Sequence, residues 1–405
     1  MRQAKHYANF SVKFFLLLII VAAVFAYAMF QGGFVSWFLF YSFLPFALYS
    51  VLFGFYRLTA FQVKRELKQK RYTAGEKMTV TIRINRILPF PLVYLYVEDL
   101  LPPELKKQES SGKKVVFPWF KRSITVEYAI DPLQRGRHEF SAIRMKTGDM
   151  LGLVEKELSV PIEDDILVFP QYREIHYRQI ENKYAHGSVA STVQKMRDTT
   201  MAAGVREYVP GDKFSWIDWK ATARKNSIMT KEFEQVQTND VTIMLDRTAG
   251  GSPIMFEKSV VFAASAARAV IRQGGRLGFL SIGSERTVMP FNYGKGQEEK
   301  IFYHLASVRA DSRIPFSDLI EQEIGKWPIG STIMLVTHQL PADLVRTLEN
   351  LSYRNHALYL FLMTGRRELG PEETKRINRL RVQHIIVKVV GSDNFKKVFD
   401  EVRQP

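Results

Sequence analysis

The first part of the chain is apolar without interruption. Residues 14–56 contain no charged side chain, and the polar, glycine-rich Gln31-Gly32-Gly33 divides this run into residues 14–30 and 34–56. Each piece is close to the ~20 residues with which a helix crosses ~30 Å of hydrocarbon. The pattern predicts two transmembrane helices joined by a tight turn, which form a hairpin domain of residues 1–60.

Basic residues flank the apolar run on both sides, whereas the turn inside it carries no charge. The positive-inside rule therefore predicts a two-span cell-membrane protein whose termini and soluble domains are both cytoplasmic. A cleaved signal peptide is the alternative, because Ala26-Tyr27-Ala28 resembles a cleavage site, although the run is long for a signal sequence. The flanking basic residues are Arg2, Lys5 and Lys13 before the run, and Arg57, Lys64, Arg65, Lys68, Lys70 and Arg71 after it.

The next region alternates between apolar and polar positions. Apolar residues take every second position of residues 78–84 and again of residues 124–130, which is the pattern of half-buried strands. Turn signals such as Asp131-Pro132 and Arg135-Gly136 separate the alternating segments. We therefore predict a small antiparallel β-sandwich over residues 61–170.

Beyond Asp240 the pattern changes to short apolar runs that alternate with amphipathic helices. This order is typical of a parallel sheet covered by helices on both faces. It predicts a doubly wound α/β domain over residues 241–405, preceded by a linking segment of residues 171–240. The predicted strands are residues 241–246, 276–282, 331–337, 356–363 and 382–390, and the predicted helices are residues 256–272, 297–310, 316–326, 342–353 and 372–380.

Composition narrows the chemistry that is open to the chain. Its 405 residues include no cysteine, which excludes disulfides, thiolate metal sites and cysteine nucleophiles. The net charge of +16 allows an anionic-lipid or nucleic-acid binding module, but no nucleic-acid recognition motif accompanies it. Because the densest basic run directly follows the apolar segment, we expect membrane lipid as a partner and no nucleic acid.

The most distinctive segment begins with Arg206-Glu207-Tyr208-Val209-Pro210-Gly211-Asp212 and continues through Trp216-Ile217-Asp218-Trp219 to Ala223-Arg224. It resembles the hallmark of the domain of unknown function 58 family, in which a turn with Gly-Asp leads into a helix that bears Asp-Trp and ends in Ala-Arg. The resemblance extends upstream to Arg135-Gly136 and residues 148–153 and, with the membrane helices, covers essentially the whole chain. The residues of this motif and interaction site are Arg206, Tyr208, Gly211, Asp212, Asp218, Trp219 and Arg224.

Local chemistry predicts a helix inside this motif. Pro210-Gly211 favours a turn, and Asp212 is placed to cap a helix that starts directly after it, because its carboxylate accepts a backbone N–H of the first turn. Trp216 and Trp219 would then share one face of that helix. On this interpretation the turn, the cap and the two tryptophans form one structural unit.

The charged residues of the motif need partners as well. Asp218 and Arg224 do not lie on one helix face at their spacing, so each is expected to pair elsewhere, and Arg206 is a candidate partner of Asp212 or Asp218. We favour a structural clamp over a catalytic role, with ion pairs and tryptophans that fasten the linking segment to the α/β domain, because buried charges need partners whatever the function.

The resemblance further implies that the α/β domain is similar to von Willebrand factor A domains, which bind a divalent metal through Asp-x-Ser-x-Ser. Such sites work because hard cations take several oxygen ligands. Here Asp246 and Thr248 retain oxygens, but Gly250 has no side chain and Arg247 adds positive charge. Thr337-His338 stands where such domains supply another aspartate. We therefore expect a degraded magnesium site at Asp246 and Thr248, and no other cofactor.

No enzyme is predicted from these features. Isolated glycine pairs lack the spacing of a phosphate loop, and the histidines lack metal-ligand spacing. Because members of the family are encoded beside MoxR-type AAA ATPases and transglutaminase-like membrane proteins, the resemblance implies a membrane-tethered protein-interaction adaptor in a bacterial chaperone-like or envelope-related assembly. The alternative is a hydrolase or transferase with a site between sandwich and α/β domain, built from Arg206, Asp212, Asp218 and Arg224.

Overall fold

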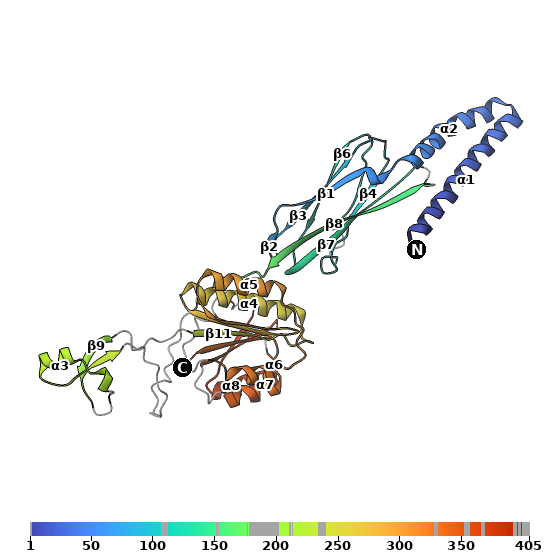
Figure 1. Ribbon diagram of the computed structural model, residues 1–405. Coiled ribbons are helices and arrows are strands. Elements are labelled where there is room, and N and C mark those ends of the chain that lie inside the picture. Colours follow the sequence, from blue (N-terminus) through green and yellow to red (C-terminus); the bar gives the residue numbers. More distant parts are fainter. Residues whose placement is uncertain are drawn as a thin grey trace. The chain divides into compact units, whose positions relative to one another are not determined.

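The chain folds as two compact units, Met1–Gln171 with Phe302–Val308, and Tyr172–Ile301 with Arg309–Pro405. Each unit is described by itself. Taken together, the described residues form helices and several β-sheets, which confirms the coarse prediction of a mixed α and β fold. The computed structural model (Figure 1) describes residues 2–405 except 107–111, 151, 153, 176, 178–201, 210–211, 213, 234–239, 328–330, 352–356, 366–368, 392–394, 396–397 and 399–405.

Two helices open the chain as an antiparallel pair (Figure 1), α1 (Arg2–Gln31) and α2 (Phe34–Phe55). Gly32 stands at the turn with a φ of +62°, a left-handed conformation that glycine adopts without strain. Across the pair, the ring of Phe25 meets that of Trp37 edge-on at 6.5 Å between centroids. The predicted hairpin of two helices joined by a tight turn is therefore present.

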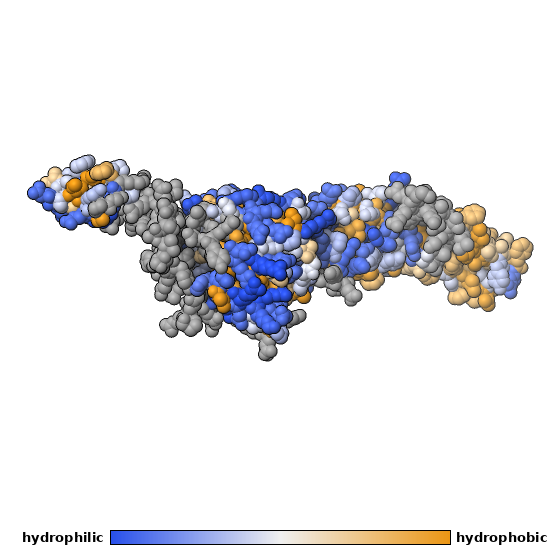
Figure 2. All heavy atoms as spheres, turned by 90° about the horizontal axis from the view of Figure 1, so that it is seen from below, coloured by the Kyte–Doolittle hydropathy of each residue, from blue (hydrophilic) through white to orange (hydrophobic). Residues whose placement is uncertain are grey.

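Among the described residues, α2 is the helix that is long and apolar enough to cross a membrane. The apolar part of α1, Leu18–Gln31, is shorter. Figure 2 shows hydrophobic surface gathered over the part of the chain that carries α1 and α2. These features indicate membrane association at the N-terminal end, while the predicted pair of spans stays a prediction.

A short 3-10 helix, Leu58–Ala60, leads from α2 into two sheets that share one hydrophobic core. Met78, Val80, Ile82 and Ile84 are fully buried, which confirms the period of two at these positions. The smaller sheet consists, in order, of β1 (Phe61–Leu67), β3 (Met78–Arg86) and β6 (Ser123–Ile130). The larger sheet consists, in order, of β2 (Arg71–Thr73), β8 (Glu155–Phe169), β7 (Gly136–Gly148), β4 (Leu95–Asp99) and β5 (Lys113–Val116).

One pairing in the larger sheet corrects the prediction of an antiparallel sandwich. The edge strand β2 runs parallel to β8, with Tyr72 opposite Val168. The chain leaves β1 in the smaller sheet and crosses to the edge of the larger sheet within three residues, so β2 enters beside β8 in the same direction. The other pairings within these two sheets are antiparallel.

A buried ion pair joins the two sheets. The side chains of Arg65 on β1 and Asp99 on β4 are both fully buried, with Nη2 2.6 Å from Oδ1. Tyr128 donates its hydroxyl to the same carboxylate at 2.6 Å, and burial, followed by the charge of Asp99, raises the pKa of Tyr128. Because a buried charge requires a satisfied partner, this cluster fixes β1 relative to β4. It is a structural pair inside the sandwich.

The second unit contains a six-stranded sheet with helices on both faces, as Figure 1 shows. Its strands, in order across the sheet, are β13 (Arg286–Asn292), β12 (Arg276–Ile282), β11 (Asp240–Leu245), β14 (Thr332–Thr337), β15 (Ala357–Met363) and β16 (Ile386–Val390). Its helices are α4 (Pro253–Arg272), α6 (Phe316–Ile324), α7 (Ala342–Leu351) and α8 (Pro371–Val382), together with the start of α5 (Lys295–Ser307), whose residues from Phe302 on are grouped with the first unit.

Five of these strands run parallel to their neighbours, in agreement with the predicted α/β pattern. The pattern missed β13, which is antiparallel to β12 and contains Pro290, a residue tolerated at the edge of a sheet. The last strand begins at Ile386 instead of Val382, because α8 continues through Val382. The differences from the prediction are thus one missed edge strand and one strand boundary.

The motif segment folds as a small hairpin with a helix between its strands. β9 (Ala202–Glu207) and β10 (Met229–Phe233) pair antiparallel. The 3-10 turn Phe214–Trp216 and the helix α3 (Trp219–Lys225) lie between them in the sequence. We refer to residues 202–233 as the motif hairpin.

Candidate functional site

The carboxylate of Asp246 lies at the carboxyl end of the central strand β11 and is buried. Its Oδ1 accepts the backbone N–H of Thr248 at 2.9 Å and the Thr248 hydroxyl at 2.6 Å. Its Oδ2 accepts the hydroxyl of Thr337, at the end of the neighbouring strand β14, at 2.6 Å. Both oxygens of Asp246 are therefore engaged by donors of the chain itself.

The next residue, Arg247, places a buried cation beside this carboxylate. Its guanidinium donates to the carbonyl of Arg309 at 2.8 Å and to the hydroxyl of Ser281 at 3.4 Å. Nη2 also forms an ion pair with Asp311 at 2.6 Å. Burial opposes the charge of Asp311, but hydrogen bonding from Ser284 and the charge of Arg247 outweigh it, so the pKa of Asp311 is lowered.

The residues at Asp246 and Thr248 do not fit a magnesium ion. The donor set is one carboxylate and two hydroxyls, whereas a hard divalent cation takes six or more oxygens. Arg247 holds the nearby Asp311 in an ion pair. The part of the chain that the structure describes contains no group of three or more acidic or histidine side chains arranged to hold a metal.

His338 and Gln339 pack closely against the loop that follows Asp246. A Cβ on Gly251 would lie 2.1 Å from Nε2 of His338 and from the side-chain nitrogen of Gln339. Burial lowers the pKa of His338, and the charge of Asp246 opposes that shift. These two side chains therefore leave no room for a side chain at position 251.

In the motif hairpin, Arg206 pairs with Asp212. Nη2 of Arg206 lies 2.7 Å from Oδ1 of Asp212, and Oδ2 of the same carboxylate accepts the backbone N–H of Val209 at 3.1 Å. One of the two predicted pairings of Arg206 is therefore present. The pair closes the turn between β9 and the 3-10 helix.

The helix cap of the motif is Asp218, which corrects the prediction that Asp212 caps a helix. Oδ1 of Asp218 accepts the backbone N–H groups of Lys220 and Ala221, each at 3.0 Å. The chain first makes the 3-10 turn Phe214–Trp216, and α3 starts only at Trp219. Asp212 therefore lies too far upstream to reach the first turn of α3.

Two aromatic residues of the motif hairpin, Phe214 and Trp219, are exposed, and the prediction that Trp216 and Trp219 share one helix face is wrong. Trp216 belongs to the 3-10 turn and Trp219 to α3. Phe214 is 77% exposed and Trp219 71% exposed, and the ring of Tyr208 stacks on Phe214 at 6.1 Å. The hairpin presents an aromatic face to its surroundings.

Two further motif residues have different outcomes. Arg224 is exposed in the last turn of α3, where a cation is favourable at the negative end of the helix dipole. Gly211 lies outside the described residues. The sequence also gave no signal for Ser281 and Asp311, which contact Arg247 from positions 34 and 64 residues away in the chain.

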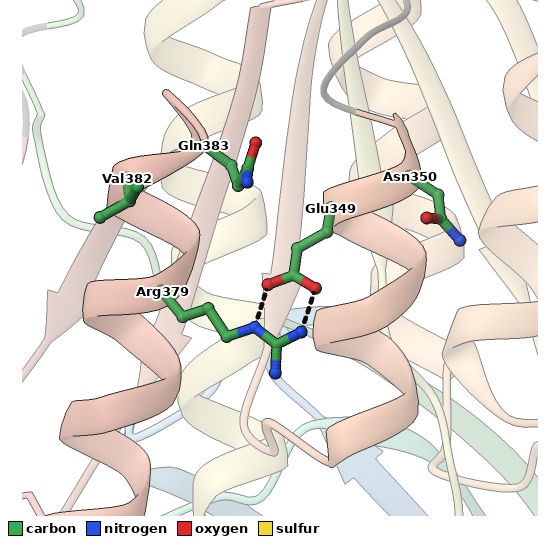
Figure 3. A pocket seen from close by; sticks show the side chains of 5 residues that line it. All are labelled: Glu349, Asn350, Arg379, Val382 and Gln383. Carbon is green, nitrogen blue, oxygen red and sulfur yellow. Dashed lines mark hydrogen bonds and ion pairs between the residues drawn. The ribbon is translucent and has the colours of Figure 1, made fainter.

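A surface recess of about 370 Å³ lies between α7 and α8 (Figure 3). Nη2 of Arg379 donates to Glu349 at 2.8 Å, and this pair ties the two helices together. The recess holds no motif residue and no nucleophile. Its remaining lining residues are Asn350, Val382 and Gln383.

Comparison with known proteins gives one family and one close relative. A family model described as protein of unknown function DUF58 matches residues 204–369. The chain is 36% identical over 390 residues to the uncharacterized protein YeaD of Bacillus subtilis (strain 168), a match that covers 95% of this chain and 97% of that protein.

Solved structures give only weak likenesses. The PilB minor pilin from Streptococcus sanguinis aligns with a TM-score of 0.29 at 8% identity, over 77% of this chain and 87% of that chain. The sporulation control protein Spo0M from Bacillus subtilis aligns with a TM-score of 0.14 at 14% identity, over 27% of this chain and 49% of that chain. TM-scores this low carry no argument about fold or function.

Proposed function

This chain belongs to the family of proteins of unknown function DUF58, and on that premise we propose that it is a non-enzymatic, membrane-tethered adaptor that docks on a MoxR-type AAA ATPase. The adaptor serves a chaperone-like or envelope-related assembly, in which other membrane proteins are further partners. Nucleotide chemistry belongs to the ATPase, because this sequence has no phosphate loop.

The tether in this proposal is the helical pair α1 and α2. Both helices cross the cell membrane as a hairpin, with both termini and the soluble domains in the cytoplasm. The uncharged run of residues 14–56 and the basic residues on either side of it support this topology. The length and apolarity of α2 support it as well.

The adaptor role is carried by one observation, the exposed aromatic face of the motif hairpin. Phe214 and Trp219 are among its most exposed side chains, and large aromatic residues dominate the binding energy of protein interfaces. They lie in the segment that identifies the family, within the match of residues 204–369. A surface that faces solvent with aromatic rings is suited to docking.

The α/β unit of the proposed adaptor is a von Willebrand factor A-like domain. A largely parallel sheet, helices on both of its faces, and Asp246 with Thr248 at the end of the central strand support this assignment. The donor set at Asp246 supports docking without a bridging magnesium ion.

The hydrolase or transferase alternative has less support. The carboxylate of Asp212 is held by Arg206 and a backbone N–H, and the carboxylate of Asp218 caps α3. A catalytic acid or base needs a pKa matched to its task and access to a substrate. Both carboxylates are therefore already engaged in contacts that shape the backbone.

Photocrosslinking in native membranes tests the adaptor role. A photoreactive phenylalanine at position 219 of the full chain is expected to capture an AAA ATPase, with a yield that changes between ATP analogue and ADP. The same probe at Tyr293, which is 70% exposed on a different surface, is the matched control. Equal capture of the ATPase at both positions, or none at 219, contradicts the proposal.

The proposed topology has a direct test, because the chain has no cysteine of its own. A membrane-impermeant maleimide is expected to label Gln31→Cys in intact cells, since Gln31 stands at the turn between the helices. Asp343→Cys, on the exposed face of α7, is expected to react only after the membrane is permeabilised. Labelling of Asp343→Cys in intact cells would refute the cytoplasmic location.

A further inference from the structure

The end of the β-sandwich next to α2 carries a rim of exposed apolar side chains. They lie in two loops, residues 87–92 between β3 and β4 and residues 117–122 between β5 and β6. Each side chain is at least half exposed, although it belongs to a domain with a well-filled core. The rim residues are Ile87, Leu88, Phe117, Trp119 and Phe120.

A buried arginine holds the two loops together. Arg86 at the end of β3 is 4% exposed, and its guanidinium donates to the carbonyl of Phe90 in the first loop at 2.8 Å and to that of Trp119 in the second at 3.1 Å. Nε donates to the carbonyl of Lys121 at 2.9 Å. Because charge-assisted hydrogen bonds are strong, the two loops of the rim are held in a fixed position relative to each other.

The rim is also hydrogen-bonded to the end of α2. Tyr49 donates its hydroxyl to the carbonyl of Pro91 at 2.9 Å, and Tyr56 donates to that of Leu88 at 2.9 Å. On the neighbouring hairpin of β7 and β8, Asp149 accepts the hydroxyl of Ser50 at 2.6 Å. The rim therefore lies at the level of the last two turns of α2.

Lys156 completes this attachment. Its ammonium group donates to the carbonyls of Phe53, Gly54 and Tyr56, at 2.9, 2.8 and 2.6 Å. These carbonyls lie at the C-terminal end of α2, where a cation is favourable. The angle between α2 and the sandwich is set by these contacts.

The length of α2 that remains free of the sandwich is short for a span. Residues 34–48 of α2 rise only about 22 Å at 1.5 Å per residue, against a hydrocarbon core of about 30 Å. Part of the end that carries Tyr49 and Tyr56 must therefore lie within the membrane if α2 crosses it. Fixed contacts bring the rim to the same depth.

Charge at the rim fits the same location. Arg57, Lys121 and Arg122 are exposed beside the apolar side chains. Aromatic side chains with basic neighbours are the combination found at membrane–water interfaces, where the rings lie among the headgroups and the cations meet anionic lipid.

We propose that the apolar rim of the sandwich inserts into the interfacial layer of the bilayer that α2 crosses, with Lys121 and Arg122 on anionic headgroups. This inference rests on the proposed membrane tether and adds a second attachment to it. The bilayer then holds the sandwich at a fixed depth and tilt, so the soluble part leaves the membrane in a defined direction. The occupant of the rim is lipid, and a second copy of the chain is the competing outcome.

Site-directed spin labelling of the full chain in nanodiscs of phosphatidylcholine and phosphatidylglycerol tests the insertion. A nitroxide at Leu88→Cys or Phe120→Cys is expected to collide more with oxygen and less with a water-soluble nickel complex than one at Glu139→Cys. Glu139 is exposed on β7, about 30 Å along the strand from the rim. Phe38→Cys, on the exposed side of α2, reports the span itself.

The outcomes distinguish failure of the rim insertion from failure of the proposed membrane tether. Embedding of Phe38→Cys with the two rim labels as aqueous as Glu139→Cys overturns the inference and leaves the tether intact. An aqueous Phe38→Cys overturns both. Spin–spin broadening at Phe120→Cys shows that a second copy covers the rim, which also overturns the inference.

A charge-reversal variant supplies an independent measurement. Lys121→Glu and Arg122→Glu are each expected to lower the ratio of inserted to aqueous rim label about fivefold in phosphatidylglycerol membranes. The same substitutions are expected to change little in pure phosphatidylcholine. An equal change in both lipids would show that the headgroup charge has no part in the attachment.

Discussion

Two regions with carboxylates and basic residues are built in opposite ways. Around Asp246 and Arg247, buried polar groups bind one another at the end of the parallel sheet. In the motif hairpin, Asp212 and Asp218 shape the backbone, and the aromatic rings next to them face outward. The first region is closed and polar, whereas the second presents exposed aromatic rings beside its charged residues.

The contrast distinguishes buried polar groups, which stabilise the fold, from exposed aromatic rings, which are available for binding. A closed polar cluster contributes to stability, because each of its groups would be left unsatisfied if a neighbour were removed. An exposed aromatic face contributes little to the stability of its own segment and has its effect in binding. Substitutions in the two regions are therefore expected to change different measurements.

The largest expected effect is that of Asp246→Ala. It removes the acceptor of the Thr248 and Thr337 hydroxyls inside a buried site, and we expect a loss of about 3 kcal/mol in the local free energy of opening. Hydrogen exchange of the β11 and β14 amides in the full chain measures it. Asp343→Ala, an exposed aspartate, is the control, and an equal loss in both variants would contradict the closed cluster.

A smaller effect is expected from the cap of α3. Asp218→Ala removes the acceptor of two first-turn amides, so the α3 amides should lose about 1 kcal/mol of protection. Asp212→Ala, which breaks the pair with Arg206 instead, should leave those amides unchanged. Fraying of α3 in Asp212→Ala and not in Asp218→Ala would reverse the assignment of the cap.

Acid sensitivity gives the third measurement. Since the pKa of Asp311 is lowered in the folded protein, its charge stabilises the fold above its unfolded pKa of about 3.9, and that contribution is lost as the pH falls through the folded value. Because the pair is partly exposed, its contribution is below about 1 kcal/mol. In Asp311→Asn the free energy of unfolding should fall less steeply as the pH is lowered through this range. An unchanged pH dependence would show that the ion pair with Arg247 does not stabilise the fold.

The sequence predicted the regular elements because their burial is periodic. The alternation at residues 78–84 and the apolar runs of β11, β12, β14 and β15 each fill a core face, and the structure buries those faces. By contrast, β13 alternates between exposed and half-buried residues around Pro290. A half-exposed edge strand leaves too little hydrophobic signal to be recognised.

The polar contacts were harder to predict, for a different physical reason. The cap of α3 had a local signal, since Asp218 directly precedes the good helix formers of α3, but Pro210-Gly211 pointed to Asp212. Arg247 with Asp311 had none, because the partners meet only when β11 and the loop after α5 pack together. Exposure of Trp219 is likewise a property of the fold, since an aromatic residue in the sequence is compatible with a core or a surface.

The last prediction compares substitutions in the two regions by two measurements, hydrogen-exchange protection and capture of the ATPase. Because Phe214 and Trp219 are mostly exposed, Phe214→Ser and Trp219→Ser should each change the protection of the motif hairpin by less than about 0.5 kcal/mol. If the hairpin is the docking face, each should weaken capture of the ATPase roughly 30-fold, the effect of losing an interface hot spot. Asp246→Ala should do the reverse, with reduced protection of β11 and little direct loss of capture. Loss of hairpin protection in Trp219→Ser would mean that this ring is packed within the protein, and the contrast between a closed polar cluster and an open aromatic face would then fail.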